Sequence, residues 1–224
     1  MGKTRTSLPG VMLRDATVTD ADAVMRLLAV VNPEDPRAFE GVRMNLSWPQ
    51  EGPLSHFRSL MVVAVSDKGE TLGVLIGGVP LWLFGHPGVD TALARLLAER
   101  VAVVTAVAVD PDQRGRGIGA VLIRHAVRRF TRAGYGLLTL NCFPDLENYY
   151  RGLGFSVMDA LNVALSPLNA VGHEWGDTRM AARPLDRYTT FVDVPGLTSP
   201  VVSGLLPRTR MACGTYFDGQ EFRV

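Results

Sequence analysis

The sequence predicts a domain of the α/β class, and three observations lead to that prediction. The chain has 224 residues, enough to bury a complete core, and 47% of them are hydrophobic. Apolar runs of strand length alternate with stretches whose apolar residues recur at helical spacing. The run Val101–Val109, expected to be buried on both faces, leads through a glycine-rich turn into an amphipathic helix that reaches Phe130. This order of strand, turn and helix forms the central unit of the expected fold.

The composition of the chain argues against several classes of binding partner. The formal net charge is +1, so the chain lacks the strong basic field of nucleic-acid binders. No run approaches the roughly 18 apolar residues of a membrane span, and no apolar segment of a signal peptide follows the polar start MGKTRTSLPG. Cys142 and Cys213 form no CxxC pair, which gives neither a metal-ligand spacing nor a disulfide framework. We therefore expect a cytoplasmic protein with no metal, no nucleic-acid partner and no membrane partner.

The first expected elements are a strand and a helix. Val11–Asp15 has the composition of a strand, and the apolar spacing that follows predicts a helix. Thr19 and Asp22, three residues apart, are typical of a capping box at its start. A pair of prolines ends this helix, and a second helix is expected over Arg37–Leu46.

A hairpin and an insertion come next. Ser59–Ser66 and Thr71–Pro80 are expected strands, joined by a turn in which Gly69 takes positive φ. About twenty residues then separate the hairpin from the organising strand, far more than a hairpin loop needs. This insertion contains Trp82 and an expected helix over Asp90–Arg100. Its apolar side chains either cover the sheet or form part of the wall of an acceptor site.

After the central helix, the pattern indicates shorter elements and an apolar tail. The expected elements are a strand at Leu137–Asn141, a helix at Leu146–Leu153, and two closing strands at Phe155–Leu165 and Thr178–Ala182 linked by Ser166–Gly176. The last residues, Asp186–Val224, are too apolar for a disordered extension. We expect residues 1–224 to form one domain, with the tail packed at a homodimer contact or over the acceptor cleft.

The turn before the central helix has the chemistry of an anion site. Gly115, Gly117 and Gly119 let the backbone approach a ligand closely and adopt positive φ. Their amides, together with the first turn of the helix, form a concave set of donors where the helix dipole also favours negative charge. A pyrophosphate fits such a site.

Two familiar phosphate loops do not match this turn. A Walker loop needs Lys-Ser or Lys-Thr after its last glycine, and Gly119 is followed by Ala120 and Val121. A dinucleotide fingerprint needs GxGxxG, and GRGIG is one residue short. An ordinary glycine-rich strand-to-helix turn is the remaining alternative.

Two motifs resemble one known family. The run Arg114-Gly115-Arg116-Gly117-Ile118-Gly119, after the strand end formed by Val107, Val109 and Pro111, resembles the acyl-CoA loop of the GNAT-type N-acetyltransferase superfamily. Tyr150-Arg151-Gly152-Leu153-Gly154-Phe155 resembles the YxxLGF motif that closes the same fold. The resemblance covers about Val11 to Leu185 and leaves the last forty or so residues outside it.

The resemblance implies a fold, a co-substrate and site residues. The fold is a mixed, mostly antiparallel central sheet, splayed between its two central strands and flanked by helices, and the co-substrate is acetyl-CoA. Val107 and Val109 would contact the pantetheine through their main chain, and Tyr150 would protonate the leaving thiolate. Its neighbour Tyr149 should point elsewhere on the helix. The residues that would hold the pyrophosphate are Arg114, Gly115, Arg116, Gly117, Ile118, Gly119 and Ala120.

The sequence also departs from the family pattern. Many members carry an asparagine seven residues before the tyrosine, and that position is Phe143, so Asn141 or Asn148 would have to substitute. The expected strand contains no acid, which leaves Glu99 and Asp145 as candidates for the general base. The form CxPxLxxYYxxLGF, with MAARPL, is similar to the branch that acetylates small molecules, including aminoglycoside 2'-N-acetyltransferases.

The predicted function is acetyl-CoA-dependent acetylation of a small-molecule amine, such as an antibiotic or another metabolite. The amine would attack the thioester directly, without a covalent intermediate on the enzyme. One alternative is an acyl-CoA-binding sensor or partner-binding domain without turnover. Transfer of a longer acyl group, or transfer to a protein amine, is the other.

Overall fold

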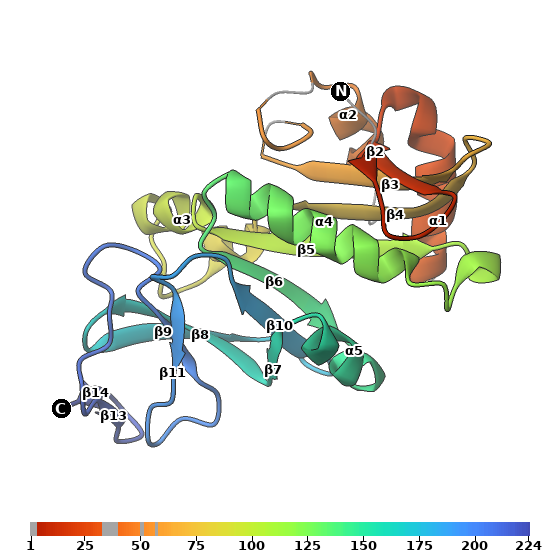
Figure 1. Cartoon of the computed structure of the whole chain (residues 1–224). Coiled ribbons are helices and arrows are strands. Elements are labelled where there is room, and N and C mark those ends of the chain that lie inside the picture. Colours follow the sequence, from red (N-terminus) through yellow and green to blue (C-terminus); the bar gives the residue numbers. More distant parts are fainter. Residues whose placement is uncertain (1–3, 33–39, 50–51, 57) are drawn as a thin grey trace. The chain divides into compact units, whose positions relative to one another are not determined.

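The computed structural model describes residues 4–32, 40–49, 52–56 and 58–224 (Figure 1). The chain divides into two compact units, each assembled from two stretches of sequence. Unit 1 consists of residues 1–78 and 104–133, and unit 2 consists of residues 79–103 and 134–224. The strand β5, Val101–Val109, gives its first residues to unit 2 and its last residues to unit 1. The chain therefore passes between the units within this strand.

Unit 1 is built on a sheet in the order β1-β2-β3-β4-β5. The first four strands are β1 (Thr4–Arg5), β2 (Val11–Asp15), β3 (Leu60–Ser66) and β4 (Thr71–Gly78). These four strands pair antiparallel with one another in that order. Gly69, in the turn between β3 and β4, has a φ of 86°. The expected first strand and the expected hairpin are both confirmed.

Two helices pack on opposite faces of this sheet (Figure 1). They are α1 (Ala21–Val31), against β4, and α4 (Ile118–Arg132), against β3 and β4. Val74 belongs to the same buried cluster as the α1 side chains, while the α-carbon of Gly73 faces Ile118 and Leu122 of α4. Because successive strand residues point to opposite faces, these two neighbours assign one helix to each face.

The start of α1 corrects one expectation. The 3-10 turn η1 (Val18–Asp20) precedes the helix, and the capping box is formed by Thr17 and Asp20. The Thr17 amide donates a hydrogen bond to Asp20 Oδ2 at 2.8 Å. The box expected from Thr19 and Asp22 is therefore wrong, because the 3-10 turn moves the capping residues two positions earlier.

The second expected helix is α2 (Glu40–Leu46), which adds two buried side chains to the cluster beneath α1. The earlier part of that expectation, residues 37–39, lies outside the described residues.

Unit 2 contains two larger sheets and a small hairpin. In the first sheet, β10 lies between β6 and β7 and is antiparallel to both. In the second sheet, β8 pairs antiparallel with β9 and parallel with β12. The strands are β6 (Leu137–Cys142), β7 (Ser156–Met158), β8 (Ala160–Ser166), β9 (Asn169–Glu174), β10 (Arg179–Pro184), β11 (Thr190–Val192), β12 (Val201–Ser203), β13 (Tyr216–Phe217) and β14 (Phe222–Arg223).

The closing strands differ from the expectation. The stretch Phe155–Leu165 is two strands, β7 and β8, which are separated by Asp159 and belong to different sheets. Aspartate is a poor strand former, and here its carboxylate pairs with Arg179 of β10. The expected link Ser166–Gly176 contains the strand β9, because a turn at Pro167 and Leu168 folds the chain back onto β8.

The insertion folds as the 3-10 helix η3 (Leu81–Gly85) and the helix α3 (Thr91–Ala98). Leu83 and Leu97 are buried with side chains of β8 and β9. Trp82 stacks on His173 of β9, with ring centroids 4.7 Å apart. These side chains cover the sheet of unit 2, and a role of the insertion in acceptor binding stays a prediction.

The tail is part of the core of unit 2. Its strand β12 lies between β8 and β11, and its residues Val201 and Val202 are completely buried. A place for the tail at a dimer contact or over the acceptor cleft stays a prediction, as does the folding of the chain as one domain.

The expected fold class, a mixed and mostly antiparallel α/β fold with flanking helices, is confirmed. The strand β5 is less buried than expected: Ala106 and Ala108 are buried, whereas Val107 and Val109 are half-buried and Thr105 is exposed. No helix in the described ranges is long and apolar enough to cross a membrane.

Candidate active site

The last residues of β5 direct their main-chain groups alternately toward β4 and away from it. The Asp110 amide donates a hydrogen bond to the carbonyl oxygen of Leu72, beside β4, at 3.0 Å. Because main-chain groups of successive strand residues point to opposite edges, those of Val107 and Val109 point away from β4. A ligand that runs along this edge would meet the two residues in the manner of a neighbouring strand.

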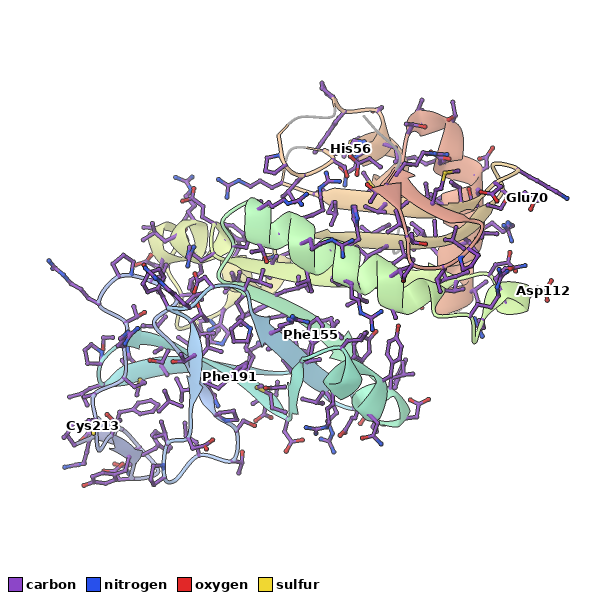
Figure 2. All side chains as sticks on the ribbon, in the orientation of Figure 1. His56, Glu70, Asp112, Phe155, Phe191 and Cys213 are labelled. Carbon is purple, nitrogen blue, oxygen red and sulfur yellow. The ribbon has the colours of Figure 1, made fainter. Side chains whose placement is uncertain are left out.

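The turn after β5 is held by Asp110. This residue caps the 3-10 helix η4 (Pro111–Gln113), and its carboxylate accepts a hydrogen bond from the Asp112 amide at 3.2 Å. Arg26 of α1 donates to the same carboxylate at 3.0 Å. These two hydrogen bonds, that from Arg26 first, lower the pKa of Asp110 below its ordinary value. The side chain of Asp112 itself projects outward from the turn (Figure 2).

Six consecutive main-chain amides follow without a protein acceptor. From residue 115 to residue 120, no amide donates a hydrogen bond to any group in the described part of the chain. The amide of Val121 is the first that does, to the carbonyl oxygen of Gly117 at 3.1 Å. The first amides of a helix have no carbonyl partner within it, and the positive end of the helix dipole lies at the same place.

The backbone of this turn fits an extended anion. Gly115 and Gly117 have φ angles of 75° and 82°, which side-chain-bearing residues rarely adopt. Gly117 is the N-cap of α4, and nothing lies within 4 Å of the position where Gly115 would carry a Cβ. Ile118 is buried beneath the turn and anchors it to the core of unit 1. The site can therefore receive a pyrophosphate through main-chain amides alone.

The two arginine side chains of the turn are directed to the turn itself. Arg114 Nε donates to the carbonyl oxygen of Val109 at 3.4 Å, and Arg116 donates to the side chain of Gln113. Both are exposed. They brace the loop while leaving its amides open.

This turn lies within the part of the chain that matches a known family. The family model for the Acetyltransferase (GNAT) family matches residues 25–155, which is more than half of the chain. The chain belongs to the GNAT family. It is therefore an acetyltransferase, and acetyl-CoA is its co-substrate. The resemblance expected from the two motifs is confirmed.

Solved structures agree with this GNAT fold. A phosphinothricin acetyltransferase from Sinorhizobium meliloti, in complex with acetyl-CoA, is 22% identical with a TM-score of 0.53, over 78% of this chain and 88% of that one. The ribosomal-protein-S18-alanine N-acetyltransferase from Escherichia coli is 19% identical, with a TM-score of 0.51, over 79% and 94%. An N-acetyltransferase from Staphylococcus aureus is 16% identical, with a TM-score of 0.52, over 79% and 99%. Comparison with curated protein sequences gives no match.

The second GNAT motif lies in unit 2. The strand β6 leads through the 3-10 helix η5 (Pro144–Leu146) into α5 (Glu147–Gly152), which carries Tyr150. The Tyr150 side chain is 8% exposed, and its ring meets those of Tyr149 and Phe155 edge to face. Tyr149 is exposed, which agrees with the expectation that the two neighbours point in different directions.

Burial controls the protonation of Tyr150. It raises the pKa of the phenol far above its ordinary value, and the nearby Tyr149 and Cys142 act in the same direction. In the described part of the chain, no group forms a hydrogen bond with its hydroxyl. Burial also raises the pKa of the Cys142 thiol. Tyr150 is thus a neutral hydrogen-bond donor, and Cys142 is a protonated thiol rather than a nucleophilic thiolate.

The candidates for the general base remain without support from geometry. Glu99 is an exposed residue at the end of α3, and Asp145 is exposed in η5. Asn141 and Phe143 are also exposed, so neither is fixed in a buried site. The general base stays unassigned.

Sequence reasoning missed several residues that shape these two regions. Arg26, far from the loop in the sequence, fixes Asp110, and the methyl groups of Leu8 lie 3.8 and 3.9 Å from the position that a Cβ on Gly117 would take. Glu147 of α5 is paired with Arg151 and with Arg179 of β10, at 3.2 Å in each case. The spacing of Glu147 and Arg151, four residues apart on one helix, could have been read from the sequence. No motif identifies the other contacts, because the fold alone brings those residues together.

Proposed function

We propose that this GNAT enzyme transfers the acetyl group of acetyl-CoA to an amine of a small molecule. The observation that carries the proposal is the row of six open amides at residues 115–120, placed at the start of α4 and next to the end of β5. In this assignment the amides of Gly115, Arg116, Gly117, Ile118, Gly119 and Ala120, with the braced side chain of Arg114, bind the pyrophosphate.

The main chain of β5 binds the rest of the donor in this proposal. Val107 and Val109, whose main-chain groups point away from β4, hold the pantetheine as a partner strand would be held. When bound, acetyl-CoA supplies the acetyl group as an activated thioester. The amide near Val109 polarises the carbonyl oxygen of this thioester, and the neutral amine of the acceptor attacks its carbon directly.

Tyr150 is the proposed general acid. A bond between nitrogen and carbon forms while the bond between carbon and sulfur breaks. The nitrogen then gives up one proton, which passes to water, and the departing thiolate has to gain one. The raised pKa keeps the Tyr150 phenol protonated across the working range of pH, which supports its role as the donor. The raised pKa also makes full transfer of the proton costly, so the hydroxyl first donates a hydrogen bond to the developing thiolate.

The acceptor is the finer part of the proposal. The sequence form around Tyr149 and Tyr150 is similar to the small-molecule branch of the family. The solved structures with the same fold include one acetyltransferase for phosphinothricin and one for a ribosomal protein, so fold alone does not choose between the two classes. A cytoplasmic location and a homodimer remain predictions.

Binding of the donor is tested by isothermal titration with acetyl-CoA. We expect the unaltered protein to bind it and Gly117→Glu to abolish binding, because the new residue is strained at φ 82° and places a negative charge among the amides. Gly134→Glu is the matched control: Gly134 has a φ of 86° just after the other end of α4, with nothing within 4 Å of its Cβ position. Equal affinity of Gly117→Glu and Gly134→Glu for acetyl-CoA would contradict the assignment.

Transfer is tested by thiol release with a panel of amines, followed by mass spectrometry of the products. We expect release of free thiol that depends on a small-molecule amine, and a product that has gained one acetyl group. Turnover only with peptide amines would refute the proposed acceptor class while leaving the acetyltransferase activity in place.

A further inference from the structure

A hollow lies in unit 1, along the flank of α4 that faces the N-terminal segment. It is an open hollow of about 340 Å³, large enough for a phosphate group and part of the molecule that carries it. The residues that line it are Thr4, Thr6, Ser7, Leu13, Val121, Arg124 and Arg128. Among these described residues, none carries a carboxylate.

Two arginines give the hollow its charge. Arg124 and Arg128 are one helical turn apart on α4, so their side chains extend from the same face. Both are exposed, and neither forms an ion pair or a hydrogen bond with any residue in the described ranges. Like charges at this spacing repel each other. Arg129, next to Arg128 in the chain, is instead bound by Asp15 at 2.7 Å. Arg132 also has no ion pair or hydrogen bond in the described ranges, but it lies outside the hollow, so what distinguishes Arg124 and Arg128 is that they line it together.

The N-terminal segment forms the opposite wall. Thr4 of β1 is paired with Leu13 of β2, whose buried side chain lies at the floor of the hollow. The Thr6 hydroxyl is used internally: it donates to the carbonyl oxygen of Val11 at 2.8 Å and accepts from the Leu8 amide at 3.0 Å. These bonds fix the segment and leave the hydroxyls of Thr4 and Ser7 as its open donors.

The same segment connects the hollow with the pyrophosphate turn. Leu8 follows Ser7 directly, and its methyl groups lie within 4 Å of the Cβ position of Gly117. The hollow and the turn are thus joined twice, by this segment and by α4 itself. A ligand in the hollow would hold in place the residues that border the turn.

We infer that this hollow binds a phosphate monoester. Two guanidinium groups match the double negative charge of a phosphate, and each can donate two parallel hydrogen bonds to its oxygens. The hydroxyls of Thr4 and Ser7 can donate further hydrogen bonds. With them the hollow offers more donors than the two oxygens of a carboxylate require, which favours phosphate over a carboxylate as the ligand. Backbone amides make the site at the start of α4, whereas side chains make this one.

Two sources could supply the phosphate. One is the 3'-phosphate of acetyl-CoA, and this source rests on the proposed function. The other is a separate phosphorylated metabolite, which would bind whether or not the donor is present. Titrations that compare the two chemistries separate these sources.

The first arm compares acetyl-CoA with 3'-dephospho-acetyl-CoA by isothermal titration. If the donor supplies the phosphate, the unaltered protein binds acetyl-CoA about tenfold more tightly or better, as expected for hydrogen bonds to a charged group. The double variant Arg124→Gln/Arg128→Gln then binds both donors equally. Arg132→Gln, on the same helix and outside the hollow, keeps the preference of the unaltered protein.

The second arm measures thermal unfolding with inorganic phosphate against chloride at the same ionic strength. If a separate phosphate is the ligand, phosphate raises the Tm of the unaltered protein and of Arg132→Gln, but not that of the double variant, while both donors bind equally. Because Arg124 and Arg128 are exposed, the double variant should unfold in chloride at the Tm of the unaltered protein. The single variant Arg124→Gln is the second test if it does not.

The outcomes decide between the hypotheses. The inference is overturned if the double variant retains every phosphate response of the unaltered protein, or if the unaltered protein shows none. Failure of the proposed function would look different: the unaltered protein would bind neither donor but would still respond to inorganic phosphate. We expect the same two results for the Gly117→Glu variant, whose pyrophosphate turn is disrupted.

Discussion

Two connections in the chain have the same order of elements and present different chemistry. In unit 1, β5 leads through η4 into α4, and in unit 2, β6 leads through η5 into α5. A proline opens both 3-10 turns. After η4 the chain adds four residues, two of them glycines with positive φ, before a helix of 15 residues begins. After η5 the helix begins at once and is six residues long.

The added residues decide what each connection offers a ligand. In unit 1 the glycines turn six amides outward, so the backbone provides the donors and side chains such as Ile118 only anchor it. In unit 2 the short helix leaves no such row, and the role proposed for this connection rests on one buried side chain, Tyr150. Backbone chemistry depends on conformation, whereas side-chain chemistry depends on identity and burial.

The largest effect is expected from removing the hydroxyl of Tyr150. We predict that Tyr150→Phe lowers kcat by about a hundredfold or more, the usual contribution of a positioned proton donor. Because the ring and its packing against Phe155 are retained, the Tm and the affinity for acetyl-CoA should change little. Steady-state thiol release, with isothermal titration beside it, measures both quantities.

The matched control for this variant is its neighbour. Tyr149→Phe removes the same atom from an exposed residue of the same helix and should leave kcat within about twofold, as surface changes usually do. Full activity of Tyr150→Phe together with a loss in Tyr149→Phe would reverse the assignment of the acid.

In unit 1 the corresponding test adds a methyl group to the strand β4, which packs against the two ends of the pyrophosphate turn. A Cβ added to Gly73 of β4 would lie 3.0 Å from the Ala108 carbonyl oxygen and 3.2 Å from Ile118 Cγ2. Overpacking of this kind costs about 1–3 kcal/mol. We predict that Gly73→Ala lowers the Tm and raises the KM for acetyl-CoA, because it pushes on both sides of the pyrophosphate turn.

Gly41→Ala provides the control for Gly73→Ala. Gly41 lies in α2, and nothing is within 4 Å of its Cβ position, so alanine there should leave the Tm unchanged or raise it. An unchanged Tm and KM in Gly73→Ala would show that the sheet beneath the turn adapts to the methyl group.

A buried titratable residue of α4, His125, gives a third test. Burial first, and then the nearby Arg129 and Arg128, lower the pKa of His125 to about 4. The histidine is therefore neutral when folded, and the unfolded chain binds the extra proton below about pH 6.5. The free energy of unfolding should be at its full value above that pH and fall as the pH drops from 6.5 toward 4.

The loss should be on the order of 2 kcal/mol, and His125→Gln should reduce it. Burial also lowers the pKa of His56, so this residue should make the free energy of unfolding fall with pH in the same direction, by a smaller amount. The variant His56→Gln/His125→Gln would remove both contributions. Urea unfolding at a series of pH values measures these slopes. Equal slopes in the single variant and the unaltered protein would mean that His125 is charged in the folded state.

The first connection could be predicted closely from the sequence. The backbone site requires Gly115 and Gly117 at fixed spacing, and such a requirement is visible in the residue types themselves. The strand β5 and the start of α4 follow from apolar spacing, and both lie where expected. The YxxLGF motif predicted Tyr150 as the general acid, and this role stays a prediction, whereas the depth of its burial came only from the structure.

Other features depend on contacts between distant residues, which the sequence does not show. The pairing of Arg26 with Asp110 spans 84 positions. The break between β7 and β8 at Asp159 depends on the pairing of Asp159 with Arg179. The hollow beside Arg124 depends on where the N-terminal segment folds back. The capping box was misplaced because Thr17 and Thr19 both have suitable chemistry, and only the 3-10 turn selects between them.

The smallest effect is expected at the residue that holds the turn of unit 1. Asp110→Ala removes the acceptor of the Asp112 amide and the partner of Arg26. The loss of one capping residue should weaken acetyl-CoA binding by about fivefold with little change in kcat, since it loosens the amides without touching the reacting atoms. Asp112→Ala, whose carboxylate projects outward from the same turn (Figure 2), should bind acetyl-CoA as the unaltered protein does. If the two alanine variants bind equally well, the glycines alone set the conformation of the turn, and its difference from the connection in unit 2 rests entirely on the added residues.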